Sequence, residues 1–263
     1  MRAIWSGAIG FGLVNIPIKL FSATESSSLD LDMLDKSNNS NIRFARINKD
    51  TGEEVAWKDI VKGYKYEGEY VVLSDEDFQK VSPKKSKMID IEEFVEEPMV
   101  DAAFHDTPYY IEPAKGGEKA YALLREALKE TGKVALGRYI MRTKENFCML
   151  RAHENILMLV KLRFPEEIRD YSELNIPSER TAIKPAELKM ATALIDQLTP
   201  KKFNIEKYKD TYDKELLKII KAKAGGKKVA EPKFKMVTSK SKDLMQQLKE
   251  SLESGSGSHK KAS

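Results

Sequence analysis

The residues most able to do chemistry in this sequence are a set of cations between residues 134 and 164. This segment reads as β-strands, in which successive side chains point to opposite faces. Arg138 and Arg142 fall on one face, about 13 Å apart at the usual rise per residue, which is close to the roughly 12 Å width of the major groove of duplex DNA. Lys161 and Arg163 point away from the apolar face of a later strand, and neither strand contains an acid. This set predicts a rigid sheet that grips phosphates, although a polar face turned to water is an equally ordinary explanation.

A second candidate group is acidic. Asp90, Glu92 and Glu93 lie in the segment IDIEEFVEE at residues 89–97, and such carboxylates are compatible with a metal-dependent nuclease. A strand edge with a solvated acidic face explains them better, because no partner carboxylate or lysine motif accompanies them. The histidines are scattered along the chain, at His105, His153 and His259. We therefore expect no catalytic base, no metal site and no cofactor.

The cations would be positioned by a meander of three short strands. Turns are predicted at residues 143–146 and 152–155, where asparagine stands beside charged residues. Alternate residues from 135 to 141 form an apolar face in the first strand, and alternate residues from 156 to 164 do so in the third. The pattern predicts antiparallel strands that pack on a core by one face and present cations on the other.

The first part of the chain is also predicted to be mainly β-structure. Residues 2–24 are rich in Ile, Phe and Val but are interrupted by glycines and a proline, which suits bent strands of a closing barrel. A polar loop is expected at residues 26–41. Strands are expected again over residues 42–73, with turns at residues 49–52 and around Gly68.

Helices are predicted at four places from apolar spacing and capping signals. They cover residues 74–81, with Ser74 as N-cap, residues 118–131, ended by Gly132, a stretch that begins at Pro185, and about residues 210–224. The third helix carries a stripe of Leu188, Ala191, Ile195 and Leu198. The last two helices can pack back on the β domain or reach around a second subunit.

Composition places few bounds on function, but the charge is unevenly distributed. The 263 residues are 41% hydrophobic, which is enough for a core, and the net charge is only +4. From Lys221 onward, 11 lysines stand against 4 acids, a local +7 that leaves residues 1–220 at about −3. A basic tail of this kind contacts nucleic acid or an acidic partner, or simply solubilises the chain. The single Cys148 excludes an internal disulfide and fits a reducing cytosol, and no signal peptide or membrane span is predicted.

The end of the chain is expected to be a lysine-rich flexible tail with one short amphipathic helix at about residues 241–253. Its apolar side, which we expect to bind a partner, consists of Leu244, Met245, Leu248 and Leu252. A short isolated helix is marginal in water. It is therefore expected to fold either against another protein or against the body of its own chain.

Several segments, taken in order, form a set of motifs. They are the opening RAIWSGAIGFGLVNIPIKLFSATE, VKGY at residues 61–64 with YVVLSDEDF after it, IDIEEFV, residues 135–150 with their RTKENF core, and LRFPEEIRD at residues 162–170. This set resembles the bacterial Ku family. Together these motifs span residues 2 to about 200. An ordered set is far more specific than any one motif. The polar loop at residues 26–41 and the tail beyond Gly225 are the variable parts.

The resemblance implies a mixed α/β fold with a mostly antiparallel, seven-stranded β-barrel of the Ku type. The barrel core would cover residues 1–184, with a long DNA-encircling arm at about residues 31–72. A helical arm that embraces a second copy would cover residues 185–225, and the flexible tail residues 226–263. The residues implied to contact DNA are Arg43, Arg46, Lys49, Lys58, Lys62 and Lys65 of the arm, and Arg138, Arg142 and Lys144 of the barrel.

The resemblance also implies a function without catalysis. Two copies would form a ring that binds double-stranded DNA ends regardless of sequence and recruits an ATP-dependent ligase of the ligase D type, in non-homologous end joining at the bacterial nucleoid. Lys and Arg contacts to phosphates position a protein without reading sequence, and no aromatic cluster interleaves with the cations as single-strand binding requires. The competing functions are a nucleoid-coating protein that ignores DNA ends and the metal-dependent nuclease.

Overall fold

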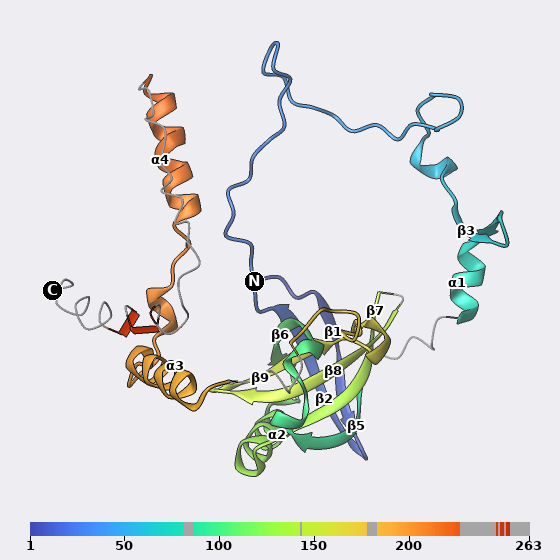
Figure 1. Cartoon of the computed structure of the whole chain (residues 1–263). Helices are drawn as coiled ribbons and strands as arrows, with labels where there is room; N and C mark the ends of the chain where they lie inside the picture. The colour runs from blue at the N-terminus through green and yellow to red at the C-terminus, as the bar shows by residue number, and fades with distance from the viewer. Residues whose placement is uncertain are drawn as a thin grey trace. The chain divides into compact units, whose positions relative to one another are not determined.

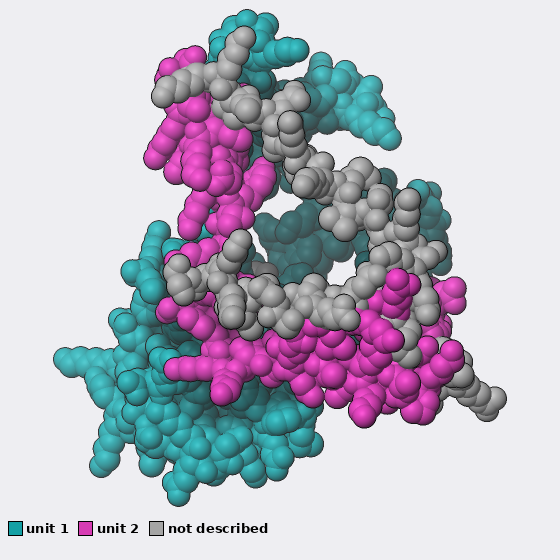
Figure 2. Space-filling view, turned by 60° about the vertical axis from the view of Figure 1, so that its left-hand side comes forward, with its two compact units in different colours: residues 1–171 teal, residues 172–263 magenta. Residues whose placement is uncertain are grey.

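The computed structural model describes residues 1–81, 87–142, 144–177 and 183–226, together with Gln246, Leu248, Lys249, Ser251 and Leu252 of the tail. The chain divides into two compact units, residues 1–171 and residues 172–263, which are coloured separately in Figure 2. The first unit contains every β-strand of the described residues, and the second contains α3 and α4.

Seven strands of the first unit close into a barrel in the order β1-β2-β6-β9-β8-β7-β5 (Figure 1). All neighbours are antiparallel except β1 and β5, which run parallel. The barrel strands are β1 Trp5–Phe11, β2 Val14–Ser22, β5 Met88–Glu96, β6 His105–Pro113, β7 Lys133–Met141, β8 Lys144–His153 and β9 Ile156–Leu162. The predicted mixed fold with a mostly antiparallel barrel is thereby confirmed.

The strand that carries the acidic segment is built into the closed barrel. β5 pairs with β7 from Ile89 to Glu96, with a bulge between Ile91 and Glu93, and with β1 from Met88 to Asp90. The prediction of a strand edge at residues 89–97 was therefore wrong at Ile89 and Asp90, whereas β5 beyond Asp90 pairs with β7 alone. Closure of a barrel removes its edges, and pairing with a strand far along the chain leaves no signal within the segment itself.

Apolar residues cover both faces of the wall formed by β7, β8 and β9. Leu157 and Leu159 are fully buried in the main core, whereas Val160 and Leu162 belong to a second buried cluster. Phe104 and other residues of the connection between β5 and β6 pack against this second cluster. The prediction of a single apolar face was wrong here. The connection covers the outer face of the wall, and in β9 the predicted core residues Val160 and Leu162 lie on that outer face.

Helix α2, Glu118–Thr131, packs into the barrel core. Tyr121, Leu124 and Leu128 are buried in the same cluster as the inward-facing strand residues. The helix ends at Gly132, whose φ of 64° is the left-handed conformation that glycine adopts without penalty. Both the helix and its predicted stop are confirmed.

Gly137 allows β7 to pass close to β5 beside the bulge. A Cβ at this position would lie 2.3 Å from the carbonyl oxygen of Asp90. We expect Gly137→Ala to lower the free energy of unfolding by about 1–3 kcal/mol, because the backbone of the barrel wall would have to shift. Thermal unfolding followed by circular dichroism measures this loss.

Gly63→Ala is a matched control, because its Cβ would meet only an ordinary contact at 3.5 Å. We expect this variant to stay within about 0.5 kcal/mol of the original protein. Equal losses from both substitutions would contradict the explanation from close strand approach.

The arm, residues 31–72, leaves the barrel between β2 and β5 and has almost no burial of its own. Every residue in it is exposed except Val55, which is half-buried. The predicted hairpin is present as β3 Lys62–Tyr66 and β4 Glu69–Leu73, followed by helix α1 Asp75–Val81. The exposed large apolar residues include Phe44, Trp57, Tyr64, Tyr66 and Tyr70. An isolated two-stranded hairpin is only marginally stable in water, so the arm needs a surface to pack on.

The second unit contains the two helices predicted after Pro185. They are α3 Pro185–Leu198 and α4 Tyr212–Ala224. Leu188, Ile195 and Leu198 of the predicted stripe are exposed. No helix in the described ranges is long and apolar enough to span a bilayer.

Part of the short tail helix is described, and it contacts α3. Gln246, Leu248, Lys249, Ser251 and Leu252 are helical, and Leu248 and Leu252 are half-buried. The side chain of Gln197 donates a hydrogen bond to the Leu252 carbonyl oxygen, at 3.4 Å. This contact favours packing on the helix's own unit at that end, whereas Leu244 and Met245 lie outside the described residues.

Candidate nucleic-acid interface

At the Lys161 end of β9 the barrel opens into a cavity of about 460 Å³, which we call the cationic mouth. It is lined by Arg142, Lys144, Asn146 and Lys161, together with Tyr109, Tyr139 and Met141. Among the described residues that line it there is no acidic side chain. The barrel therefore gathers three cations at one place.

Strand register explains why Lys161 lies in this mouth. Lys161 pairs with Cys148, which pairs with Gly137, and residues directly opposite one another share a face. Because Cys148 is fully buried in the main core, Lys161 lies on the inner face of the wall. Arg138 directly follows Gly137 in β7, so its side chain points to the opposite, outer face. The prediction that Arg138 and Lys161 share an outward face was wrong.

Arg142 belongs to a turn and not to a strand. Met141 pairs directly with Lys144, so the hairpin connection is shorter than predicted, and Lys144 begins β8. Arg142 has a φ of 61°, which is a left-handed turn conformation. The expected spacing from Arg138 along one strand therefore does not hold. Arg142 and Lys144 are instead brought together at the rim of the mouth.

Arg138 is held between two carboxylates. Its guanidinium lies 3.1 Å from Glu92 and 3.2 Å from Glu145, and its side chain is 47% exposed. No acid was expected in these strands from the sequence, because Glu145 was assigned to a turn and because Glu92 belongs to a different strand, β5. The positive charge of Arg138 is therefore largely offset within the barrel wall.

Lys161 and Arg163 share one acidic partner, Asp106. The Lys161 ammonium lies 2.9 Å from Asp106 and the Arg163 guanidinium 3.6 Å from it. Arg163 also donates to the carbonyl oxygens of Ala103 and His105. By contrast, Arg142 and Lys144 make no ion pair within the described ranges. They are the two cations of the mouth most available to an outside anion.

The Asp106 cluster predicts a pH dependence of stability. The hydrogen bond from Lys161 lowers the pKa of Asp106, against an opposing effect of burial, with help from the charges of Lys161 and Arg163. A lowered folded-state pKa contributes stability above the ordinary carboxyl pKa of about 3.9, and this contribution is lost as the pH falls through the lowered value. We expect Asp106→Asn to reduce the free energy of unfolding by about 1 kcal/mol at neutral pH. The difference from the original protein should vanish near about pH 2.

Chemical unfolding across this pH range measures the difference. Asp101→Asn, in the loop before the same strand, is the control for carboxylate loss, because Asp101 bonds only the backbone N–H of Ala103 among the described residues. A gap between Asp106→Asn and the original protein that persists in acid would rule out the ion cluster as its source.

Tyr139 lies at the floor of the mouth with an unsatisfied hydroxyl. The residue is only 2% exposed, and its hydroxyl has no hydrogen-bond partner among the described residues. Burial raises the pKa of Tyr139, so the phenol stays protonated. Trp5 fixes the ring by an edge contact, with centroids 6.2 Å apart, and donates its own indole N–H to the Ile140 carbonyl oxygen at 2.9 Å. A cavity that combines several cations with a tyrosine hydroxyl is suited to bind phosphate oxygens by charge and by hydrogen bonds.

Some cations of the arm contact an acidic or aromatic side chain of the arm or of α1, and others are simply exposed. Arg43 lies 3.7 Å from Glu54, the Arg46 guanidinium lies 4.4 Å above the Trp57 ring, and the Lys62 ammonium lies 4.7 Å above the Phe78 ring. Lys49, Lys58 and Lys65 are exposed. Residues 31–72 contain 7 basic and 8 acidic residues, so any attraction of the arm to phosphates is local and does not come from its net charge.

Comparison with known proteins agrees with this barrel. Residues 10–190 match the sequence model of the family described as the Ku70/Ku80 beta-barrel domain. The chain belongs to the Ku family. The resemblance seen in the sequence motifs is thereby confirmed, and the closed seven-stranded barrel is the Ku barrel.

Similarity to bacterial Ku proteins extends over nearly the whole chain. The Opitutus terrae protein is 40% identical over 266 residues, covering 99% of this chain and 95% of the relative. The Coxiella burnetii protein is 35% identical over 100% of this chain and 98% of its own, and that of Pseudomonas aeruginosa is 38% identical over 98% and 90%. All three are named Non-homologous end joining protein Ku. The SPOC domain of human PHD-finger protein 3 aligns with 62% of this chain and 97% of its own at 11% identity, but the TM-score of 0.32 is too low to support a conclusion.

Within this Ku barrel the acidic segment has a structural partner. Glu92 forms an ion pair with Arg138. In the described part of the chain no three His, Cys, Asp or Glu side chains are grouped so that they could hold a metal ion. Sequence reasoning missed Tyr139, Asn146 and Asp106 as parts of the interface. Only the barrel register, which pairs Tyr139 with Asn146 across β7 and β8, brings them to the mouth.

Proposed function

We propose that this Ku-family protein binds the ends of double-stranded DNA, without sequence specificity, as a homodimeric ring in non-homologous end joining. The near full-length similarity to proteins named Non-homologous end joining protein Ku carries this proposal. The protein acts by binding and has no catalysis of its own. Its place of action is the bacterial cytoplasm, at the nucleoid. Competition between linear and circular duplex tests it directly.

In this proposal the cationic mouth and the arm hold the phosphate backbone. Arg142 and Lys144 are the principal barrel contacts, because no ion pair within the described ranges competes for them. Lys49, Lys58 and Lys65 are the corresponding arm contacts. Arg43, Arg46, Lys62 and Arg138 contribute less, since each already has an intramolecular partner. Contacts of this type bind any sequence and weaken with salt.

The ring requires a second copy. The arm has exposed apolar side chains and almost no burial of its own, and helix α3 carries an exposed apolar stripe. Two-fold pairing is the commonest way to cover such surfaces. We propose that residues 185–225 and the arm pack on the partner copy. Light scattering should then give twice the 29.9 kDa chain mass.

The tail, residues 226–263, is proposed to recruit and stimulate an ATP-dependent ligase of the ligase D type. It carries 9 lysines against 4 acids, a local +5, and Leu248 and Leu252 belong to its short helix. Truncation after Gly226 should leave the dimer and end binding within about twofold and lower ligase stimulation at least about fivefold. Ligation of linear duplex with and without the protein measures this.

The control replaces the tail with a Gly- and Ser-rich segment of the same length, which keeps the tether but removes the lysines and the apolar helix. It should behave like the truncation. Full stimulation by either variant would place ligase recruitment on the barrel.

A further inference from the structure

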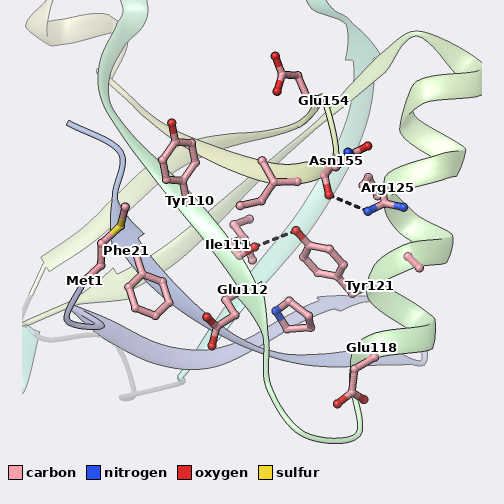
Figure 3. Close-up of a pocket in the computed structure, with 13 residues that line it drawn as sticks. Met1, Phe21, Tyr110, Ile111, Glu112, Glu118, Tyr121, Arg125, Glu154 and Asn155 are labelled. Atoms are coloured by element: carbon pink, nitrogen blue, oxygen red, sulfur yellow. Dashed lines mark hydrogen bonds between the residues drawn. The ribbon is translucent and has the colours of Figure 1, made fainter.

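A second cavity lies at the opposite end of β9 from the cationic mouth. It has a volume of about 790 Å³ and lies between β6, the turn before β9 and helix α2 (Figure 3). Phe21, Tyr110, Pro113 and Ile156 supply apolar lining, and none of them is fully buried. We call this cavity the α2 cleft. It is large enough to hold one bulky side chain and the backbone beside it.

Tyr121 explains why the barrel wall opens at this point. The last pair of the β6–β9 ladder is Ile111 with Leu157. The Tyr121 hydroxyl donates to the Ile111 carbonyl oxygen at 2.8 Å and accepts from the Leu157 N–H at 2.7 Å. The hydroxyl thus satisfies the two backbone groups that end the ladder, as Figure 3 shows for Ile111. The opening is therefore a stable feature whose buried polar groups already have partners.

The cleft is rimmed by carboxylates. Glu112, Glu118 and Glu154 line it, and its single basic side chain among the described residues is Arg125. Arg125 is committed to the wall, because it donates to the Asn155 carbonyl oxygen at 2.7 Å and pairs with Glu126 at 2.7 Å. Glu112 pairs with Lys19 at 3.3 Å. Glu118 and Glu154 have no cation partner among the described residues, so the rim has an excess of negative charge.

We infer that the α2 cleft is a docking site for a protein partner that presents a peptide segment with a bulky apolar residue flanked by lysine or arginine. The apolar lining fits the bulky side chain, and the two carboxylates without a cation partner fit the flanking cations. The same carboxylates repel nucleic acid. The cleft would therefore hold a protein while the cationic mouth, at the other end of the same strand, holds DNA.

Methyl NMR of the full-length protein, with labelled isoleucine δ1 methyl groups, tests this inference. The probes are three capped peptides of sequence Gly-Lys-Trp-Lys-Gly, Gly-Lys-Ala-Lys-Gly and Gly-Glu-Trp-Glu-Gly, titrated to about 5 mM, where weak peptide binding is measurable. The first should shift the Ile111 and Ile156 signals in a saturable way. The second should bind at least about tenfold more weakly because it lacks the buried ring, and the third should not bind.

Two matched variants separate rim charge from general charge. Glu118→Gln with Glu154→Gln should weaken binding of the Lys-Trp-Lys peptide about fivefold to tenfold. Glu76→Gln with Glu130→Gln removes two exposed carboxylates elsewhere and should leave it unchanged. DNA end binding should be the same in both variants, so this experiment fails or succeeds independently of the proposed DNA function. Equal binding of the Glu-Trp-Glu peptide, or unchanged affinity in Glu118→Gln with Glu154→Gln, would overturn the inference.

Discussion

Linear duplex DNA should outcompete an equal mass of closed circular duplex for this protein by at least about a hundredfold. The reason is topological, because a closed ring can reach the DNA axis only from a free end. Contacts between fixed cations and phosphates are the same on both substrates, so they cannot produce this difference. Competition for a labelled linear duplex, measured by fluorescence anisotropy at one salt concentration, gives the ratio.

Trapping the loaded protein provides an independent measurement. Bulky protein caps placed on both ends after loading should hold the dimer on the DNA through a high-salt wash, whereas uncapped DNA should release it. Salt dissociates a protein that is bound only through phosphates, whether or not the ends are capped. Equal competition by circles, or release from capped DNA, would exclude encirclement and favour a nucleoid-coating protein.

Reversing both available cations of the mouth, Arg142→Glu with Lys144→Glu, should weaken binding to linear duplex at least tenfold, by an order-of-magnitude estimate from lost phosphate contacts. The slope of log affinity against log salt should become shallower by about one to two units, because binding with fewer phosphate contacts releases fewer counterions from the DNA. Both side chains are exposed and lie at a hairpin end, so unfolding temperatures should barely change. Binding isotherms at several salt concentrations measure affinity and slope together.

The control reverses two exposed lysines near the α2 end of the barrel, Lys115→Glu with Lys119→Glu, and changes the net charge by the same amount. It should reduce affinity far less than the pair in the mouth. Arg138→Gln should also have a small effect on DNA binding, because Glu92 and Glu145 already offset that charge. Equal losses from both reversed pairs would mean that overall charge, and not the mouth, attracts DNA.

The sequence by itself determined part of the local structure of this protein. The turn around Gly68, whose φ is 98°, was predicted because glycine tolerates such an angle. The helix Glu118–Thr131 and its end at Gly132 were predicted from spacing and a stop signal. These features depend on neighbours in the chain, and so do the motifs that resemble the Ku family. A linear pattern is sufficient for both.

Only the tertiary structure decided which cations are available and where they point. Alternation along β7 and β9 shows that side chains take opposite faces, but it cannot show which face is interior when both are apolar. The register of the barrel places Arg138 on the outer face of the wall and Lys161 on the inner face. Their charges were offset by Glu92 and Asp106, which belong to strands distant in sequence; Lys161 and Asp106 are 55 positions apart. A residue's type makes it a candidate for a phosphate contact, but the partners that barrel closure places beside it determine how much charge remains for DNA.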